Sequence, residues 1–317
     1  MKRVVVALGG NALLHRDDEE SAEAMRTSAR HAAEVIADIA QKDWEVVVTH
    51  GNGPQVGRIL LQNEAARQFV APMPLDVCGA ESQGQIGYLL QANIGDVFYE
   101  RDMERPVVTI LTLTRVPRDD PAFQDPTKPI GPHYREDEAR RLMEQRGYDM
   151  KPASAEGSWR RVVPSPHPYS IVEAPVIQRL VGEGVIVIAA GGGGVPVVEE
   201  GPRLVGVEAV VDKDLAAAIL AKDVEADALL ILTDVAGVFE SYGRPEQRLL
   251  SGLTPEEAGR RLEAGEFGGG SMGPKVEAAM RFVESGGAQA IIAALDDGAK
   301  ALDGDAGTRI VGTSPEA

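Results

Sequence analysis

Val4-Val5-Val6-Ala7-Leu8 runs directly into Gly9-Gly10-Asn11 near the start of the chain. An unbroken run of small and branched apolar residues predicts a strand buried on both faces, and the glycines predict a tight turn where that strand ends. Similar runs recur along the chain, at residues 45–49, 107–111, 185–190, 228–233 and 288–293.

Helical stretches are expected between most of these strands, at residues 20–41, 55–69, 83–99, 174–182, 215–222, 255–263 and 276–285. Alternating strands and helices imply right-handed crossovers and a mostly parallel sheet. The sequence therefore predicts an α/β fold, with a ligand at the C-terminal ends of the strands.

Residues 115–169 break this alternation, because they are rich in proline, arginine and acidic residues and have few apolar runs. The segment is too long for a plain loop. We expect one domain over residues 1–317, with residues 115–169 forming a small inserted subdomain that acts as a lid. The alternative is a disordered surface insertion, and the strand-like residues 159–163 argue for order.

The charge balance limits the partners of the protein. The chain has 317 residues and a net charge of −17, from 32 basic and 49 acidic residues. A surface for nucleic acid or anionic membrane is not expected, because it would repel the phosphates. The single cysteine, Cys78, excludes an internal disulfide. With no signal segment and no apolar run of about 18 residues, a cytoplasmic protein is expected.

Gly268-Gly269-Gly270-Ser271-Met272-Gly273-Pro274-Lys275 is the strongest chemical signal. Glycines let backbone N–H groups approach an anion, and a helix that begins after Lys275 adds partial positive charge to that of the lysine. This arrangement predicts a phosphate site. The spacing is not that of a Walker motif. It also matches a serine-hydrolase elbow, but no histidine follows the serine as that family requires.

Asp212-Lys213-Asp214 precedes an expected helix. Asp212 is placed to cap that helix, while Lys213 would lie in its first turn, where a cation is unfavourable unless it faces an anion. Asp214 is placed to hold Lys213, and Lys275 as well. An ordinary exposed charge cluster is the alternative.

Two strand-to-turn junctions carry an asparagine, Gly9-Gly10-Asn11 and His50-Gly51-Asn52-Gly53-Pro54. Facing one another at the strand ends, they would form a small polar pocket for an oxyanion, although each alone is also explained by packing. Gly191–Gly194 suits either an anion-binding nest or a flexible turn.

With these motifs in hand, the sequence resembles the carbamate kinase family of the amino-acid kinase superfamily over essentially its whole length. The resemblance rests on the motifs at residues 7–13, 49–57, 79–84, 212–214 and 270–275. It implies a three-layer αβα sandwich with a mainly parallel sheet of about eight strands, a protruding subdomain and a homodimer. The implied reaction interconverts ATP and carbamate with ADP and carbamoyl phosphate. It needs Mg²⁺ carried by the ATP phosphates, with no metal site on the protein.

The resemblance also assigns roles. Lys213 and Lys275 would contact the transferred phosphoryl group, Asp214 would orient them, and Lys128 would reach from the lid. The small substrate would be cradled by Gly9, Gly10, Asn11, Gly51, Asn52 and Gly53. The nucleotide would be held by the two lysines with Asp234, Val238, Tyr242 and Met272. From the residues alone, a tyrosine and small apolar residues after a strand suit an adenine slot only weakly, and core packing is the default.

Two positions refine the resemblance. Related acetylglutamate, glutamate and uridylate kinases carry a lysine where this chain has Ala7, which argues against their substrates. Glu81 stands where the family has an apolar residue. Another small carboxylate or phosphate substrate, and a catalytically silent nucleotide-binding regulator, remain alternatives. The direction of the reaction, in arginine breakdown or in biosynthesis, stays open.

Overall fold

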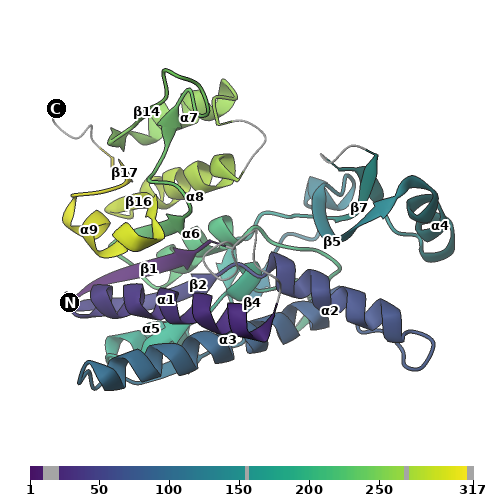
Figure 1. The fold of residues 1–317 in the computed structure, drawn as a ribbon, viewed down its shortest axis with the longest axis horizontal. Helices are drawn as coiled ribbons and strands as arrows, with labels where there is room; N and C mark the ends of the chain where they lie inside the picture. Colours follow the sequence, from purple (N-terminus) through teal and green to yellow (C-terminus); the bar gives the residue numbers. More distant parts are fainter. Residues whose placement is uncertain (10–20, 154–156, 268–270, 313–317) are drawn as a thin grey trace.

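The computed structural model describes residues 1–9, 21–153, 157–267 and 271–312. Its centre is a sheet of eight strands in the order β15-β17-β16-β12-β1-β2-β9-β3 (Figure 1). Neighbours are parallel except β16 and β17, which are antiparallel. The strands are β1 (Lys2–Leu8), β2 (Trp44–His50), β3 (Val107–Thr109), β9 (Ile186–Ile188), β12 (Ala228–Thr233), β15 (Gly252–Leu253), β16 (Gln289–Ala294) and β17 (Thr308–Ile310).

The two faces of this sheet are both apolar. Along β1, Val5 and Ala7 pack into one core, and Val4, Val6 and Leu8 pack into the other, as the period of a strand requires. One face is covered by α5 (Ala174–Gly182), α6 (Lys213–Asp223), α7 (Pro255–Glu263) and α8 (Met272–Glu284). The other is covered by α1 (Ala22–Ala40), α3 (Leu75–Glu100) and α9 (Gly298–Asp303). The predicted three-layer αβα sandwich is therefore confirmed.

Local chemistry explains where several helices begin. Thr254 and Glu257 form a reciprocal capping box at α7, and the Ser21 side chain accepts from the backbone N–H of Ala24 at α1. Helix α3 begins at Leu75 rather than at residue 83, and α8 begins at Met272 rather than after Lys275. In the second case the first turn includes Pro274, and a proline is tolerated there because the N–H groups of a first turn lack helical partners.

A second, four-stranded sheet has the order β11-β10-β4-β8. It joins β4 (Leu113–Arg115), β8 (Ser170–Ile171), β10 (Val195–Glu200) and β11 (Arg203–Gly206), and a separate hairpin pairs β13 (Phe239–Glu240) with β14 (Arg248–Leu249). Short 3₁₀ turns lie at η2 (Pro121–Phe123), η3 (Gly191–Gly193) and η4 (Leu295–Asp297). Within the described ranges, no helix combines the length and apolarity needed to cross a bilayer.

The segment between β4 and β8 contains its own three-stranded sheet, which protrudes from the main body beside α2 (Gly53–Ala66) (Figure 1). It has the order β5-β7-β6 and carries one helix. Because β4 and β8 pair with each other, the chain leaves and re-enters the body side by side. The elements are β5 (Lys128–Arg135), α4 (Glu136–Arg146), β6 (Met150–Pro152) and β7 (Ser158–Val163).

A close approach of two glycines seats the protruding sheet on α2. The pairing of β5 with β7 shifts register between Ile130 and Tyr134, and Gly131 adopts a φ of +67° in this bulge. A Cβ on Gly57 of α2 would lie 3.4 Å from the Gly131 Cα. The base of the protruding sheet is therefore held directly against the main body.

Candidate active site

A cleft of about 990 Å³ lies between the main body and the protruding sheet. Its walls are the loop that begins α2, the first turns of α6 and α8, and strands β5 and β7. Among the predicted site residues, those that line it are Gly51, Asn52, Gly53, Lys128, Lys213, Asp214 and Lys275.

Lys213 and Lys275 meet at one carboxylate. Lys213 is the first residue of α6, and its ammonium contacts Asp214 Oδ1. Lys275 lies in the first turn of α8, and its Nζ is 3.4 Å from Asp214 Oδ2 and 3.1 Å from the Ser271 carbonyl oxygen. Two stretches that are distant in sequence thus place their ammonium groups at the same point of the cleft.

Lys275 is buried to an unusual degree for a lysine, with 5% of its surface exposed. Burial lowers its pKa, and the nearby Lys213 lowers it further, while Asp214 opposes both effects. Asp214 is itself 3% exposed. The carboxylate therefore offsets part of the cost of bringing two cations together out of water.

Asp212 connects the protruding sheet to this cluster. Its Oδ1 accepts from the Asp214 backbone N–H at 2.9 Å, which caps α6, and its Oδ2 accepts from Lys128 Nζ at 2.7 Å. Burial alone would raise the pKa of Asp212, but Lys128 and the capping hydrogen bond lower it below its usual value. The capping role was predicted, whereas the ion pair with Lys128 was not.

The Asn52 loop is held from two sides. The Asn52 amide donates to Ser82 Oγ at 2.8 Å, and a Cβ on Gly192, whose φ is +66°, would collide with that amide. The run Gly191–Gly193 therefore serves at least as a close-packing turn behind Asn52. Sequence reasoning missed Ser82, although it lies in the motif at residues 79–84 on which the resemblance rests.

His50 is fully buried directly under this loop. Burial, with a smaller effect of Lys213, lowers its pKa to about 4. The neutral ring places Nδ1 at 2.9 Å from the Gly51 carbonyl oxygen. Because a carbonyl can only accept, Nδ1 carries the proton, and this bond fixes the Gly51 peptide.

Several predicted residues do not line the cleft. Gly9 follows β1 and donates from its backbone N–H to the Leu232 carbonyl oxygen at 2.9 Å. Val238 is fully buried in the core, and Tyr242 is 65% exposed with its ring 5.8 Å from that of Phe239. The remaining predictions outside the lining are Asp234 and Met272. Gly10, Asn11 and Gly268–Gly270 lie outside the described residues.

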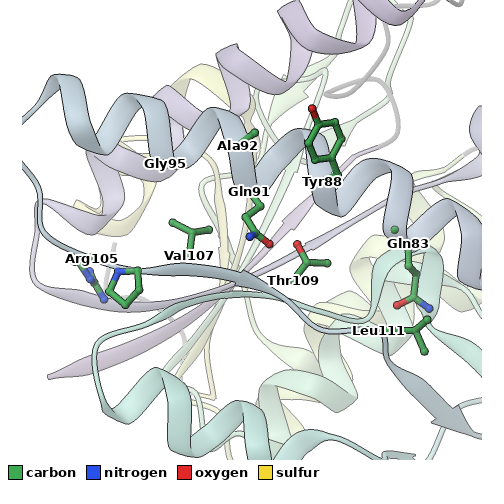
Figure 2. Close-up of a pocket in the computed structure, with 11 residues that line it drawn as sticks. Gln83, Tyr88, Gln91, Ala92, Gly95, Arg105, Val107, Thr109 and Leu111 are labelled. Carbon is green, nitrogen blue, oxygen red and sulfur yellow. The ribbon is translucent and has the colours of Figure 1, made fainter.

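A separate hollow of about 720 Å³ lies between α3 and β3 (Figure 2). Figure 2 shows Tyr88 and Gln91 on the helix and Val107 and Thr109 on the facing strand. Its described lining contains no lysine or carboxylate and has Arg105 as its cation, so it lacks the charge pattern of the cleft.

Comparisons with known proteins agree with the fold and the cleft. The chain matches the amino acid kinase family over residues 2–294. It is 51% identical to the carbamate kinase of Thermococcus kodakarensis, over 98% of this chain and 99% of that protein. It is 48% identical to the carbamate kinase of Clostridium perfringens, over 98% and 99% of the two chains.

Solved structures give the same result. A carbamate kinase from Giardia lamblia bound to AMP-PNP superimposes with a TM-score of 0.92 at 43% identity, covering 98% of both chains. A protein from Aeropyrum pernix superimposes with a TM-score of 0.93 at 42% identity, covering 98% of this chain and 99% of that one.

Proposed function

The chain belongs to the amino acid kinase family, and on that premise we propose that it catalyses the reversible transfer of a phosphoryl group between ATP and carbamate, giving ADP and carbamoyl phosphate. The observation that carries the proposal is the meeting of Lys213 and Lys275 at Asp214. Phosphoryl transfer depends on positioning and on neutralising charge at the transferred group. One buried and one partly buried ammonium group at one point of a cleft supply both.

In the proposed mechanism, the phosphoryl group passes directly between the two substrates. The carbamate oxygen is already anionic and nucleophilic, so the site needs no general base. Lys213 and Lys275 bind oxygens of the transferred group, and Asp214 keeps the ammonium groups in position between turnovers. The first turns of α6 and α8 direct backbone N–H groups and partial positive charge toward the same place.

We assign the small substrate to the side of the cleft formed by the Asn52 loop and Lys128. The Ser82 and His50 contacts fix this loop, so its polar groups are oriented before the substrate arrives. Residues 115–169 would act as the lid, with Lys128 moving from Asp212 onto the substrate. The predicted roles of Gly10 and Asn11 in the same cradle remain part of this proposal.

We propose that the nucleotide enters from the side of α8 and carries Mg²⁺ on its phosphates. The AMP-PNP complex of the Giardia lamblia relative supports nucleotide binding on this fold. Asp212 and Asp214, the carboxylates in the described cleft lining, are both held by lysines, which suits an ion whose ligands are phosphate oxygens and water. When bound, the ion would neutralise charge on the phosphates. Asp234, Val238, Tyr242 and Met272 stay the predicted nucleotide contacts.

We also propose that the protein is cytoplasmic and forms a homodimer. Strand β3 ends the large sheet, and the hollow beside it exposes Tyr88 and Leu111 (Figure 2). An apolar face next to a sheet edge suits a second copy of the chain.

The deciding experiment measures ATP formation from ADP, carbamoyl phosphate and Mg²⁺ with the purified protein. Acetyl phosphate and other small acyl phosphates, assayed in parallel, test the alternative substrates. We expect carbamoyl phosphate to give the highest kcat/KM. Nucleotide binding without turnover of any of these donors would contradict the proposal and favour the silent regulator.

A further inference from the structure

The cleft is electropositive although the protein as a whole is strongly acidic. Its described lining has five lysine and arginine side chains and two carboxylates, in a chain with a net charge of −17. The lysines account for the carboxylates, because Lys128 contacts Asp212 and the other two contact Asp214. Among the described residues, the positive charge of Arg160 on the protruding sheet therefore remains without a carboxylate.

Arg160 on β7 is a positively charged residue of the cleft lining that has few partners in the described chain. Its Nη2 donates to the Gly131 carbonyl oxygen at 2.8 Å, while its Nε is buried without a hydrogen-bond partner among the described residues. Desolvation lowers its pKa with no carboxylate in the described chain to oppose it. The Nε itself is closed off from the cleft, but Arg160 lines the cleft and has one hydrogen bond and no carboxylate partner among the described residues, so its guanidinium has a donor left for an anion there.

Arg161, the next residue of β7, differs from Arg160 because its guanidinium has charged and aromatic partners. Arg161 pairs with Glu208 at 2.7 Å and lies over the Tyr148 ring at 3.9 Å. Consecutive side chains on a strand face opposite ways, so Arg160 faces the cleft and Arg161 does not. The two residues form a natural pair of test and control.

We propose that Arg160 is a substrate-binding residue that holds the phosphate group of the small acyl phosphate at the lid wall of the cleft. The inference rests on the proposed function and extends it, because it adds a contact from the lid side to the same phosphate that Lys213 and Lys275 bind as the transferred group. A guanidinium suits this role since its planar array of donors matches phosphate oxygens.

The position of Arg160 favours the small substrate over the nucleotide. It shares the cleft with Lys128 and with the Asn52 loop, which are assigned to the small substrate. Of the predicted nucleotide contacts, Lys213 and Lys275 line this cleft, where the transferred group would lie, and the other four lie outside its described lining: Asp234, Val238, Tyr242 and Met272.

The test compares wild type with Arg160→Gln, Arg160→Lys and the control Arg161→Gln. Initial rates of ATP formation are measured while carbamoyl phosphate and ADP are varied separately. For Arg160→Gln we expect the KM for carbamoyl phosphate to rise roughly tenfold or more, the usual size of a lost charged hydrogen bond. The KM for ADP should stay within about twofold, Arg160→Lys should be intermediate, and Arg161→Gln should match wild type in both KM values.

Inhibition by inorganic phosphate separates binding from a merely structural role. Arg160→Gln removes the charge, whereas Arg160→Lys keeps the charge and loses only the planar array of donors. Competitive inhibition by phosphate against carbamoyl phosphate should weaken by the same factor as the KM rises. Titration of the protein with phosphate in a calorimeter gives a second readout that needs no turnover.

The outcomes are distinct. An unchanged KM for carbamoyl phosphate in Arg160→Gln overturns the inference, and so does a KM for ADP that rises by the same factor. If wild type makes no ATP, the proposed function fails, and phosphate titration of wild type against Arg160→Gln still decides whether this arginine binds the anion. If Arg160→Gln does not fold, Arg160→Lys is judged by the same ratio of KM values.

Discussion

Lys275 Nζ lies 3.4 Å from Asp214 Oδ2 across a separation of 61 residues. The contact joins the first turns of α6 and α8, which pack side by side on one face of the sheet. The charged centre of the cleft therefore depends on the packing of two helices, and its members should be probed together.

Replacing Lys213 or Lys275 by alanine should lower kcat by about two to three orders of magnitude, because each variant removes one group that neutralises the transferred charge. Steady-state rates of ATP formation give the measurement. Lys222→Ala, in the last turn of α6, removes the same charge from the same helix away from the cleft and should leave kcat near that of wild type.

Circular dichroism of each lysine variant must show native helix content for this comparison to count. A folded Lys275→Ala protein with wild-type turnover would refute the assigned role.

Two substitutions of Asp212 should distinguish its role as the cap of α6 from its ion pair with Lys128. Asp212→Asn keeps an oxygen that can cap α6, whereas Asp212→Ala loses the cap and should cost about 1 kcal/mol more in unfolding free energy. Both variants release Lys128, so backbone N–H groups at the start of β5 should exchange faster with deuterium in both. Unaltered exchange at Lys128 and Ile130, the residues on either side of Pro129, in the two variants would mean that the ion pair does not hold the protruding sheet.

Gly192→Ala should be more damaging than its backbone angle alone predicts. An alanine at position 192 has to adopt a φ of +66°, which is strained for a residue with a Cβ. That Cβ also collides with the Asn52 amide. Gly201→Ala is the matched control, because its φ is +59° and its Cβ would meet nothing within 4 Å. Urea unfolding should show a loss of about 1 kcal/mol for the control and a larger loss for Gly192→Ala, accompanied by a raised KM for the small substrate. If the two variants lose the same unfolding free energy and the KM of Gly192→Ala is unchanged, the Asn52 loop tolerates the added methyl group.

His50 should make the protein sensitive to mild acid. Its pKa falls from 6.5 to about 4 on folding, so the unfolded chain binds the proton more tightly than the native protein does. The stabilisation is complete above pH 6.5 and is lost as the pH falls toward 4, by up to about 3 kcal/mol.

His50→Gln lacks this titration, so its unfolding free energy should fall less than that of wild type between pH 7 and about pH 4.5. The comparison uses urea unfolding of both proteins at each pH. Parallel curves would show that His50 does not carry the effect.

The parts of the fold that rest on local pattern could be predicted. Strands β1 and β12 are continuous apolar runs, and both were placed to within two residues. The pair β10 and β11 was missed, since a strand on a small, half-covered sheet has no long apolar run to mark it. The first turns of α3, before residue 83, were also missed; they contain Gly79, whose low helix propensity is outweighed by the packing of Leu75 and Cys78.

The candidate site likewise has features that local sequence predicts and features that depend on tertiary packing. The cap at Asp212 follows from its place before a helix, and it was foreseen together with the role of Asp214 as the holder of Lys213. The pairing of Lys128 with Asp212 spans 84 residues and depends on how the protruding sheet sits on α2, which no local pattern encodes. The same applies to Arg160, which has no carboxylate partner among the described residues, a fact visible only in three dimensions.

Strand β1 lies between β2 and β12, so one of its edges is completed by residues 228–232. A ribosome must therefore make more than two thirds of the chain before the first strand can be enclosed, and until then its apolar edge is open to other chains. The chain is synthesised from its N-terminus. Its risk of aggregation is therefore greatest in the interval before β12 emerges.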